Sequence, residues 1–116
     1  MANLNKVLLI GNLTQDPELK NTTSGKPVCN FNIAINRPFA KEGQQNVDFI
    51  TVNVWSKTAE FVASYFQKGD PIFVLGQIQT RTWTGDDGVK HYATEILADE
   101  VQFVKSKESS EGSGAN

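Results

Sequence analysis

Five segments of the chain show the residue pattern of β-strands, either as a short apolar run or as alternation of apolar and polar positions. Strict alternation is typical of a strand that has one side on a core and the other side open to solvent. The expected strands are residues 6–13, 28–36, 47–55, 72–83 and 89–104, the last of them bent near Asp99.

The alternation also assigns side chains to two faces. Ile50, Val52 and Val54 are β-branched and in register, which predicts the core side of the third strand. The opposite side of that strand carries Phe49, Thr51, Asn53 and Trp55. The non-core side of the fourth strand carries Gln77, Gln79, Arg81 and Trp83. The other expected core residues are Cys29, Phe31, Ile33, Ile35, Ile72, Phe73, Val74, Gly76, Ile78 and Phe103.

One helix is predicted between the third and fourth strands. Ser56 is expected to cap a helix over residues 57–68, because serine is a favoured N-cap residue. Gly69 ends the helix, and Pro71 prevents its continuation. Residues 37–46 and 85–88 are rich in turn formers and predict hairpin loops. The apolar stripe of the helix consists of Ala59, Val62, Ala63 and Phe66.

The order of these elements favours an all-β fold with a single helix. Five strands with one α-helix between strands three and four fit a small closed Greek-key barrel, the OB-fold. An open five-stranded sheet with one covering helix has the same periodicities, so pattern alone leaves both possible. The chain of 116 residues is expected to form one domain over residues 1–104. Residues 105–116 contain no large apolar residue and are expected to be a disordered tail.

The charge balance excludes one way of binding nucleic acid. Eleven Lys and Arg against thirteen Asp and Glu give a formal net charge of −2, so bulk electrostatic capture is excluded while a local basic patch is not. Cys29 is the only cysteine, which excludes an intrachain disulfide and a multi-cysteine zinc site. No apolar run approaches the ~20 residues of a membrane helix. We therefore expect a cytoplasmic protein without cofactor or metal.

Four segments, in order, resemble bacterial single-stranded DNA-binding proteins. Residues 5–13 with the following Asp-Pro-Glu are similar to the opening of that family. Residues 48–50 with Val54-Trp55 resemble its third strand, and residues 68–70 its helix exit. Residues 76–84 are similar to its fourth strand, with a glycine, a basic residue and an aromatic. The ordered match implies a non-catalytic OB-fold domain, usually a homotetramer, that binds single-stranded DNA in replication, recombination and repair at the nucleoid.

The aromatic residues have the chemistry that such binding needs. Flat rings stack on bases of any identity, and cations follow the phosphates. Phe49, Trp55 and Trp83 project from non-core faces, and Phe39 lies in the loop 37–46. The resemblance places the stacking aromatics at these four positions, although an oligomer interface could also explain exposed tryptophans. It places basic phosphate contacts at Lys6, Lys57, Lys68 and Arg81, of which Arg81 lies two residues from Trp83 on the same strand side.

The chain also departs from the family pattern. Phe39 and Phe49 stand where well-known members carry tryptophan, and Thr51 and Thr82 where they often carry basic residues. Both changes predict weaker or less salt-sensitive binding. Ile50 replaces a histidine that is associated with subunit contacts. The family's acidic tip ending in Pro-Phe is missing here, so replication and repair proteins are expected as partners only if a native acidic tail exists.

Other function classes remain open at this stage. The residues argue against an enzyme, because His91 is the only histidine and the acids Asp86 and Asp87 are expected in a turn. The alternatives from binding classes are an OB-fold primosome-type accessory protein, an RNA-binding module or an oligomerisation module.

Overall fold

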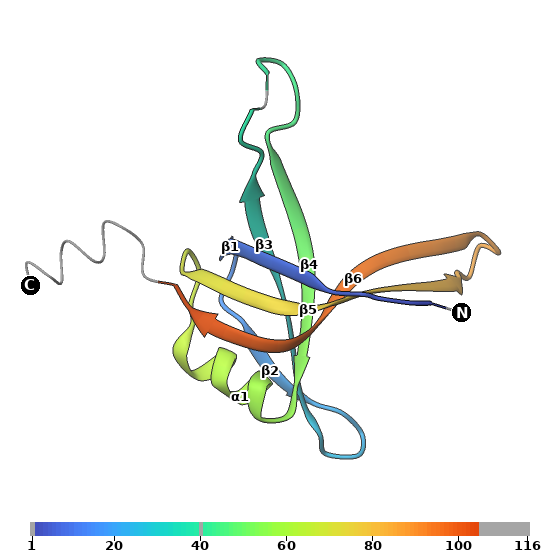
Figure 1. Ribbon diagram of the computed structural model, residues 1–116. Helices are drawn as coiled ribbons and strands as arrows, with labels where there is room; N and C mark the ends of the chain where they lie inside the picture. Colours follow the sequence, from blue (N-terminus) through green and yellow to red (C-terminus); the bar gives the residue numbers. More distant parts are fainter. Residues whose placement is uncertain (1, 40, 105–116) are drawn as a thin grey trace, which may run out of the picture.

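A computed structural model describes residues 2–39 and 41–104 of the chain. Six strands and one helix lie in this described part (Figure 1). The elements are β1 (Val7–Leu13), β2 (Glu18–Asn21), β3 (Pro27–Asn36), β4 (Val47–Trp55), α1 (Ser56–Tyr65), β5 (Pro71–Thr84) and β6 (Lys90–Phe103). The predicted tail over residues 105–116 falls outside the described residues.

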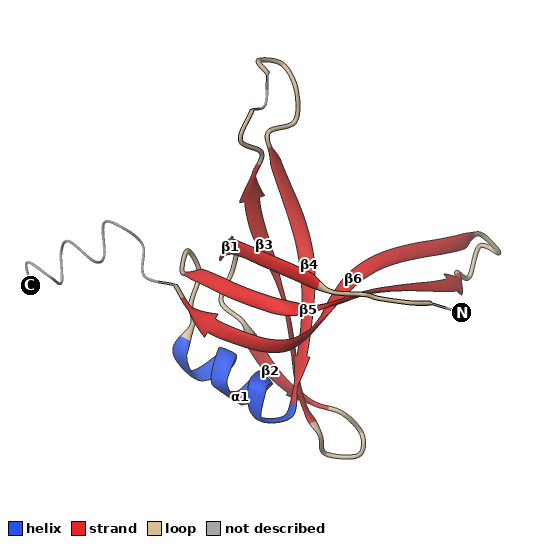
Figure 2. Ribbon diagram, viewed as in Figure 1, coloured by secondary structure: helices blue, strands red, loops and turns tan. Residues whose placement is uncertain are grey.

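Five of the strands close into a ring. The order β1-β5-β6-β4-β3 returns to β1 through the pairs Asn12↔Ala34 and Leu13↔Ile33. β4 and β6 run parallel at Val52↔Ile96, and the other pairings are antiparallel (Figure 2). Because β1 and β3 pair, the open-sheet alternative is wrong. The expected five-stranded barrel with one helix between β4 and β5 is confirmed.

β2 is the one strand that the sequence pattern missed. It pairs with β3 from Glu18↔Asn30 to Asn21↔Pro27 and forms a hairpin on the outside of the ring. All four of its residues are exposed, so neither side of β2 carries the apolar alternation by which strands are recognised.

The core fills the ring from inside, as the alternation predicts. Phe31, Ile33, Val52 and Val54 are fully buried, and α1 adds Ala59 and Val62 from the end of the barrel that it covers. Burial raises the pKa of the Cys29 thiol, with Glu18 as a smaller cause, so this side chain packs as a small neutral group. The complete buried set is Leu13, Cys29, Phe31, Ile33, Val52, Val54, Ala59, Val62, Phe66, Ile72, Val74, Ile96, Ala98 and Val101.

The ends of the helix differ from the prediction. β4 runs directly into α1, so Trp55 takes the N-cap position and Ser56 is the first helical residue, at φ 59°, with no side-chain cap. The helix ends at Tyr65 rather than at residue 68, because Phe66 is already extended. Two carboxylates hold the following turn: Asp70 accepts from the Gln67 N–H, and Asp16 accepts from the Lys68 N–H.

Three residues expected in the core lie outside it. Phe73 is half-buried on the outer side of β5, because it alternates with the buried Ile72 and Val74. Phe103 is 59% exposed, because it lies at the end of β6, where it stacks on Phe66 and meets Phe61 edge to face. Ile78 is 45% exposed, because β5 has already left the barrel at this position.

A bulge marks the point at which β5 and β6 leave the barrel. The register runs from Leu75↔Glu100 to Gly76↔Ala98, which leaves Asp99 as the extra residue of β6 and confirms the predicted bend. A Cβ on Gly76 would collide with the backbone oxygen of Leu97. Beyond this contact and the pairs that Ile96 and Leu97 make with β4, the two strands continue as a two-stranded arm, residues 79–84 and 90–95, which projects from the barrel (Figure 1).

The close backbone approach at Gly76 leads to a stability prediction. We expect Gly76→Ala to lower the free energy of unfolding by about 1–3 kcal/mol, because backbone atoms rather than flexible side chains must move. Thr80→Ala, at an exposed position of the same strand, is the control and is expected to stay within about 0.5 kcal/mol of wild type. Urea unfolding at one fixed protein concentration measures both variants. Equal stability of Gly76→Ala and wild type would show that the two strands have room to separate.

Candidate nucleic-acid interface

The outer side of the barrel carries a continuous strip of polar side chains across β3, β4, β6 and β5. Strand register places Asn30 beside Asn53 and Asn32 beside Thr51, and the arm places Gln79 beside Glu95. Side-chain hydrogen bonds join neighbouring strands along the strip. We call this strip the polar face, and its members are Asn30, Asn32, Thr51, Asn53, Gln79, Arg81 and Glu95.

Glu95 connects the barrel part of the polar face to the arm. Its carboxylate accepts a hydrogen bond from the Asn53 amide at 3.1 Å and from the Arg81 guanidinium at 3.3 Å. The Glu95 side chain is only 15% exposed, whereas that of Arg81 is 57% exposed. The guanidinium is thus held in place while much of it still faces solvent.

Aromatic rings lie along and beyond the polar face. Phe49 is 67% exposed and Trp83 is 43% exposed, while Trp55 is half-buried. Phe39 is 96% exposed in the loop between β3 and β4. The alternation assigned Phe49, Trp55 and Trp83 to the side opposite the core, and all three rings lie outside the core.

Each tryptophan has a cation over its ring. The Arg81 guanidinium lies 4.6 Å from the Trp83 ring centre, and the Lys26 ammonium lies 5.6 Å from the Trp55 ring centre. His91 also stacks on Trp83, at 5.4 Å between ring centres. These contacts place a cationic side chain beside each of the two rings.

The predicted cations occupy different parts of the molecule. Arg81 lies with Trp83 on the polar face, and Lys6 directly precedes β1 at the base of the arm, where Asn5 hydrogen-bonds both backbone groups of Ile78. The remaining two lie near the two ends of α1. Lys57 lines a shallow pocket beside the acids Asp99 and Glu100, and the Lys68 N–H is bound by Asp16.

Sequence reasoning missed two residues that contact the tryptophans. His91 faces Trp83 because the two residues pair across the β5–β6 hairpin. The length of the loop sets this register, so the sequence contained the signal for the contact. Lys26 reaches Trp55 only because β3 places Val28 opposite Trp55. No local signal in the sequence indicates that second contact.

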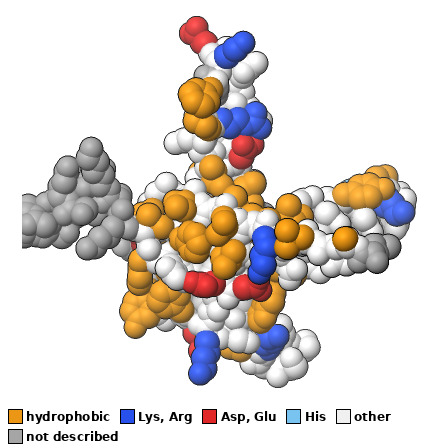
Figure 3. Space-filling model, in the orientation of Figure 1, with side chains coloured by type: hydrophobic (Ala, Val, Ile, Leu, Met, Phe, Trp, Pro, Cys, Tyr) orange, Lys and Arg blue, Asp and Glu red, His pale blue; other side chains and the backbone are white. Residues whose placement is uncertain are grey.

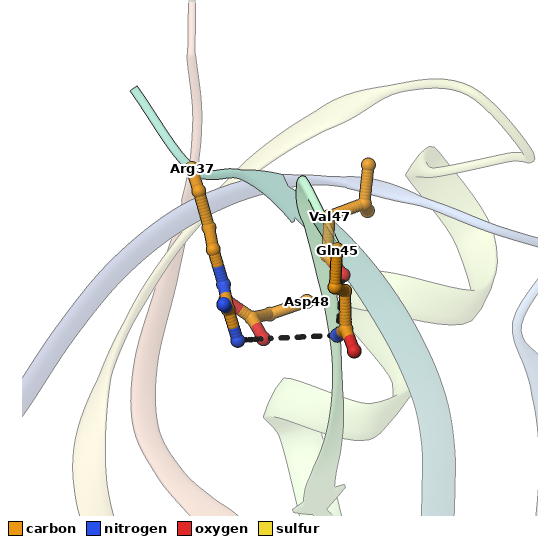
Figure 4. Close-up of polar contacts among 4 residues, drawn as sticks. All are labelled: Arg37, Gln45, Val47 and Asp48. Carbon is orange, nitrogen blue, oxygen red and sulfur yellow. Dashed lines mark hydrogen bonds and ion pairs between the residues drawn. The ribbon is translucent and has the colours of Figure 1, made fainter. Parts of the chain in front are cut away.

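A side-chain clamp closes the base of the loop that carries Phe39. The Arg37 guanidinium donates two hydrogen bonds to the Asp48 carboxylate, each at 2.8 Å, and Gln45 contacts the same carboxylate (Figure 4). These hydrogen bonds lower the pKa of Asp48 and raise that of Arg37. The clamp joins the two strands where β3 ends and β4 begins.

Comparison with known proteins agrees with this geometry. A family model described as the single-strand binding protein family matches residues 4–104. The chain belongs to this family. Its relatives include a single-stranded DNA-binding protein 3 from Clostridium acetobutylicum, 51% identical over 114 residues, which cover 97% of this chain and 79% of that protein.

Two further relatives are also matched over most of the present chain. A single-stranded DNA-binding protein from Oceanobacillus iheyensis is 48% identical over 110 residues, with 94% of this chain and 68% of that protein covered. A single-stranded DNA-binding protein 3 from Listeria innocua is 47% identical over 110 residues, with 94% and 69% covered. Within residues 2–39 and 41–104, no helix has the length and apolarity needed to cross a membrane.

The clamp predicts a pH-dependent contribution to stability where β3 ends and β4 begins. Because the native pKa of Asp48 is lowered, the contribution is complete above the ordinary carboxyl pKa of about 3.9 and is lost as the pH falls through the lower native value. We expect Arg37→Met to raise the Asp48 pKa, as measured by carboxyl carbon NMR. Arg81→Met, which leaves this clamp intact, should not shift it. An Asp48 that titrates identically in wild type and Arg37→Met would contradict the assignment.

Proposed function

We propose that this chain binds single-stranded DNA independently of an exact sequence, by stacking bases on rings and pairing phosphates with a few placed cations. The observation that carries the proposal is the set of exposed or half-buried rings, Phe49, Trp55 and Trp83, beside hydrogen-bonding groups instead of in the core. Phe39 adds a fourth ring on its loop. Binding of this kind needs no catalytic step, and the proposal includes none.

Stacking supplies most of the affinity in this proposal. Each base stacked on an aromatic side chain contributes about 1–3 kcal/mol with little dependence on base identity. Phe49 exposes the widest surface of the three rings, at 67%. Trp83 is 43% exposed beside Arg81 and His91, and Trp55 is half-buried. The rings occupy both the barrel and the arm, so a strand that contacts all of them must cross the polar face.

The cations have a positioning role that suits a chain with a net charge of −2. A guanidinium has five N–H donors. The Nε and Nη2 groups of Arg81 donate to Glu95, so other donors remain for a phosphate beside Trp83. Lys6, Lys57 and Lys68 are the further proposed phosphate contacts. Because few counterions are released, affinity is expected to fall only shallowly with salt.

The relatives support the biological setting of this proposal. The names of those from Clostridium, Oceanobacillus and Listeria describe single-stranded DNA-binding proteins. We extend this to the present chain and propose a role in DNA replication, recombination and repair, carried out in the cytoplasm at the nucleoid.

We also propose that the protein assembles as a homotetramer. The outer side of β1 exposes Leu8 at 66% and Ile10 at 55%, and register places them beside Leu75 and Phe73 of β5. Figure 3 shows hydrophobic side chains gathered over the middle of the barrel. β1 pairs with β5 on one edge, whereas its pairing with β3 begins only at Asn12, so a second copy has both an apolar surface and a strand edge to bind.

The stacking role predicts a ranking of variants. We expect Trp83→Ala and Trp55→Ala each to weaken binding of oligo-dT by about 5- to 150-fold, which corresponds to the loss of one stacked base. Removal of any single proposed lysine should cost less. Titration of intrinsic fluorescence, or of a dye-labelled oligonucleotide for the tryptophan variants, measures the affinities.

Tyr65→Ala provides the matched control, because Tyr65 is 65% exposed but belongs to the aromatic cluster of α1 and β6. It should bind oligo-dT like wild type. The proposal fails if wild type shows no binding at low salt or binds duplex DNA equally well. Equal losses from lysine and tryptophan variants would show that stacking is not the main source of affinity.

The assembly proposal has a separate test. Light scattering should give a tetramer for wild type and a smaller species for Leu8→Glu, because a charge in the middle of an apolar interface remains desolvated and unpaired. Lys20→Glu, on exposed β2, is the control and should leave the mass unchanged. A monomeric wild type would overturn the tetramer, and an unchanged mass for Leu8→Glu would exclude this surface as an interface.

A further inference from the structure

The turn between β2 and β3 places a lysine over the ring at the end of β4. Residues 22–26 form this turn, and the Lys26 ammonium lies 5.6 Å from the Trp55 ring centre. Strand register explains the contact, because Trp55 pairs with Val28, and Lys26 precedes Val28 by two residues. Residues two apart along a strand point to the same face. Lys26 therefore lies on the side of the sheet that carries the polar face.

Hydrogen bonds within the turn hold its backbone in place. The Lys26 N–H donates to the Thr22 hydroxyl at 3.1 Å, and the Thr22 N–H donates to the Lys26 carbonyl at 2.9 Å. The Gly25 N–H donates to the Thr22 carbonyl at 2.8 Å, and the hydroxyls of Thr22 and Ser24 are hydrogen-bonded at 2.9 Å. The backbone of Lys26 is thus positioned beside Trp55, whereas its four-carbon side chain keeps the freedom to move.

The charge environment of Lys26 differs from that of Arg81, the cation over the other tryptophan. Arg81 lies over Trp83 but also donates to the Glu95 carboxylate, which offsets part of its charge. In the part of the chain that the structure describes, no ion pair involves Lys26, and its side chain is exposed. The full charge of this ammonium therefore acts at Trp55.

We propose that Lys26 binds the phosphate of the nucleotide whose base stacks on Trp55. The turn over residues 22–26 then forms one end of the DNA path along β4, beyond the rings of Phe49 and Trp55. The inference rests on the proposed binding of single-stranded DNA and extends its contact surface to this turn.

The flexibility of the lysine side chain makes the two contacts at Trp55 compatible. The attraction between a cation and an exposed aromatic ring is weak, whereas a phosphate carries a full negative charge. When a base stacks on Trp55, the Lys26 ammonium can move from the ring to the phosphate of that nucleotide. A ring face and a phosphate are common to all nucleotides, so this contact is independent of base identity.

The test removes the charge of Lys26 and keeps the length of its side chain. Titration of dye-labelled oligo-dT with Lys26→Met should give a slope of log affinity against log salt that is smaller by about 0.7, the value for one phosphate of a single strand. The affinity should fall by about 3- to 8-fold at roughly 50 mM salt, and the difference from wild type should shrink towards roughly 1 M. Lys26→Arg, which keeps the charge, should bind like wild type.

Lys20→Met is the matched control, because Lys20 is exposed on the same hairpin and Val28 separates it from Trp55 in the sheet. It makes the same change in net charge but should keep the salt slope and affinity of wild type. A double-mutant cycle locates the effect further. In a Trp55→Ala background, Lys26→Met should cost less than about twofold, because no base holds the nucleotide beside the lysine.

Circular dichroism melting verifies that each variant is folded. Three results would each overturn the role of Lys26 while the DNA-binding proposal stands: a Lys26→Met protein that binds like wild type, equal losses in Lys26→Met and Lys20→Met, or an undiminished loss in the Trp55→Ala background. Failure of wild type to bind oligo-dT at low salt would overturn the DNA-binding proposal itself.

Discussion

The close approach of β5 and β6 at Gly76 is the constraint on which both surfaces of the protein depend. Only a residue without a Cβ fits within reach of the Leu97 carbonyl, and the neighbouring bulge at Asp99 bends β6 at the same point. On one side of this contact β5 carries Phe73 and Leu75 beside β1. On the other side they form the arm that positions Trp83. A single tight backbone contact therefore separates the proposed assembly surface from part of the proposed DNA-binding surface.

The polar face illustrates how a slightly acidic protein can present cationic and aromatic groups to a polyanion. Glu95 orients Arg81 with one carboxylate and also binds Asn53, so the guanidinium lies over Trp83 at a fixed position. The negative charge of Glu95 reduces the positive potential around Arg81. Because Glu95 already restrains the guanidinium, however, Arg81 loses less conformational entropy when it binds a phosphate. Such an arrangement favours a few oriented contacts over a diffuse field, in keeping with stacking as the main source of affinity.

Much of this protein follows from local patterns in its sequence. Alternation over residues 47–55 placed Val52 and Val54 inside and Phe49 and Trp55 outside, because successive side chains of a strand point to opposite faces. The bend near Asp99 and the hairpin at residues 85–88 were equally readable. The sequence pattern misplaced Phe103 and Ser56, because an aromatic at the end of a strand and a serine before a helix have their usual roles only when the neighbouring elements allow them.

The closure of the ring and the strand β2 were decided by tertiary structure alone. β2 has no apolar side and is a strand only because β3 offers it an edge at Asn30. The contact of Lys26 with Trp55 and that of Glu95 with Asn53 join residues far apart along the chain. The sequence by itself thus determined which side chains face the core and which face solvent, because side chains along a strand alternate between its two faces. Which of the solvent-facing groups meet depends on strand register around the closed barrel, and only the folded chain specifies that register.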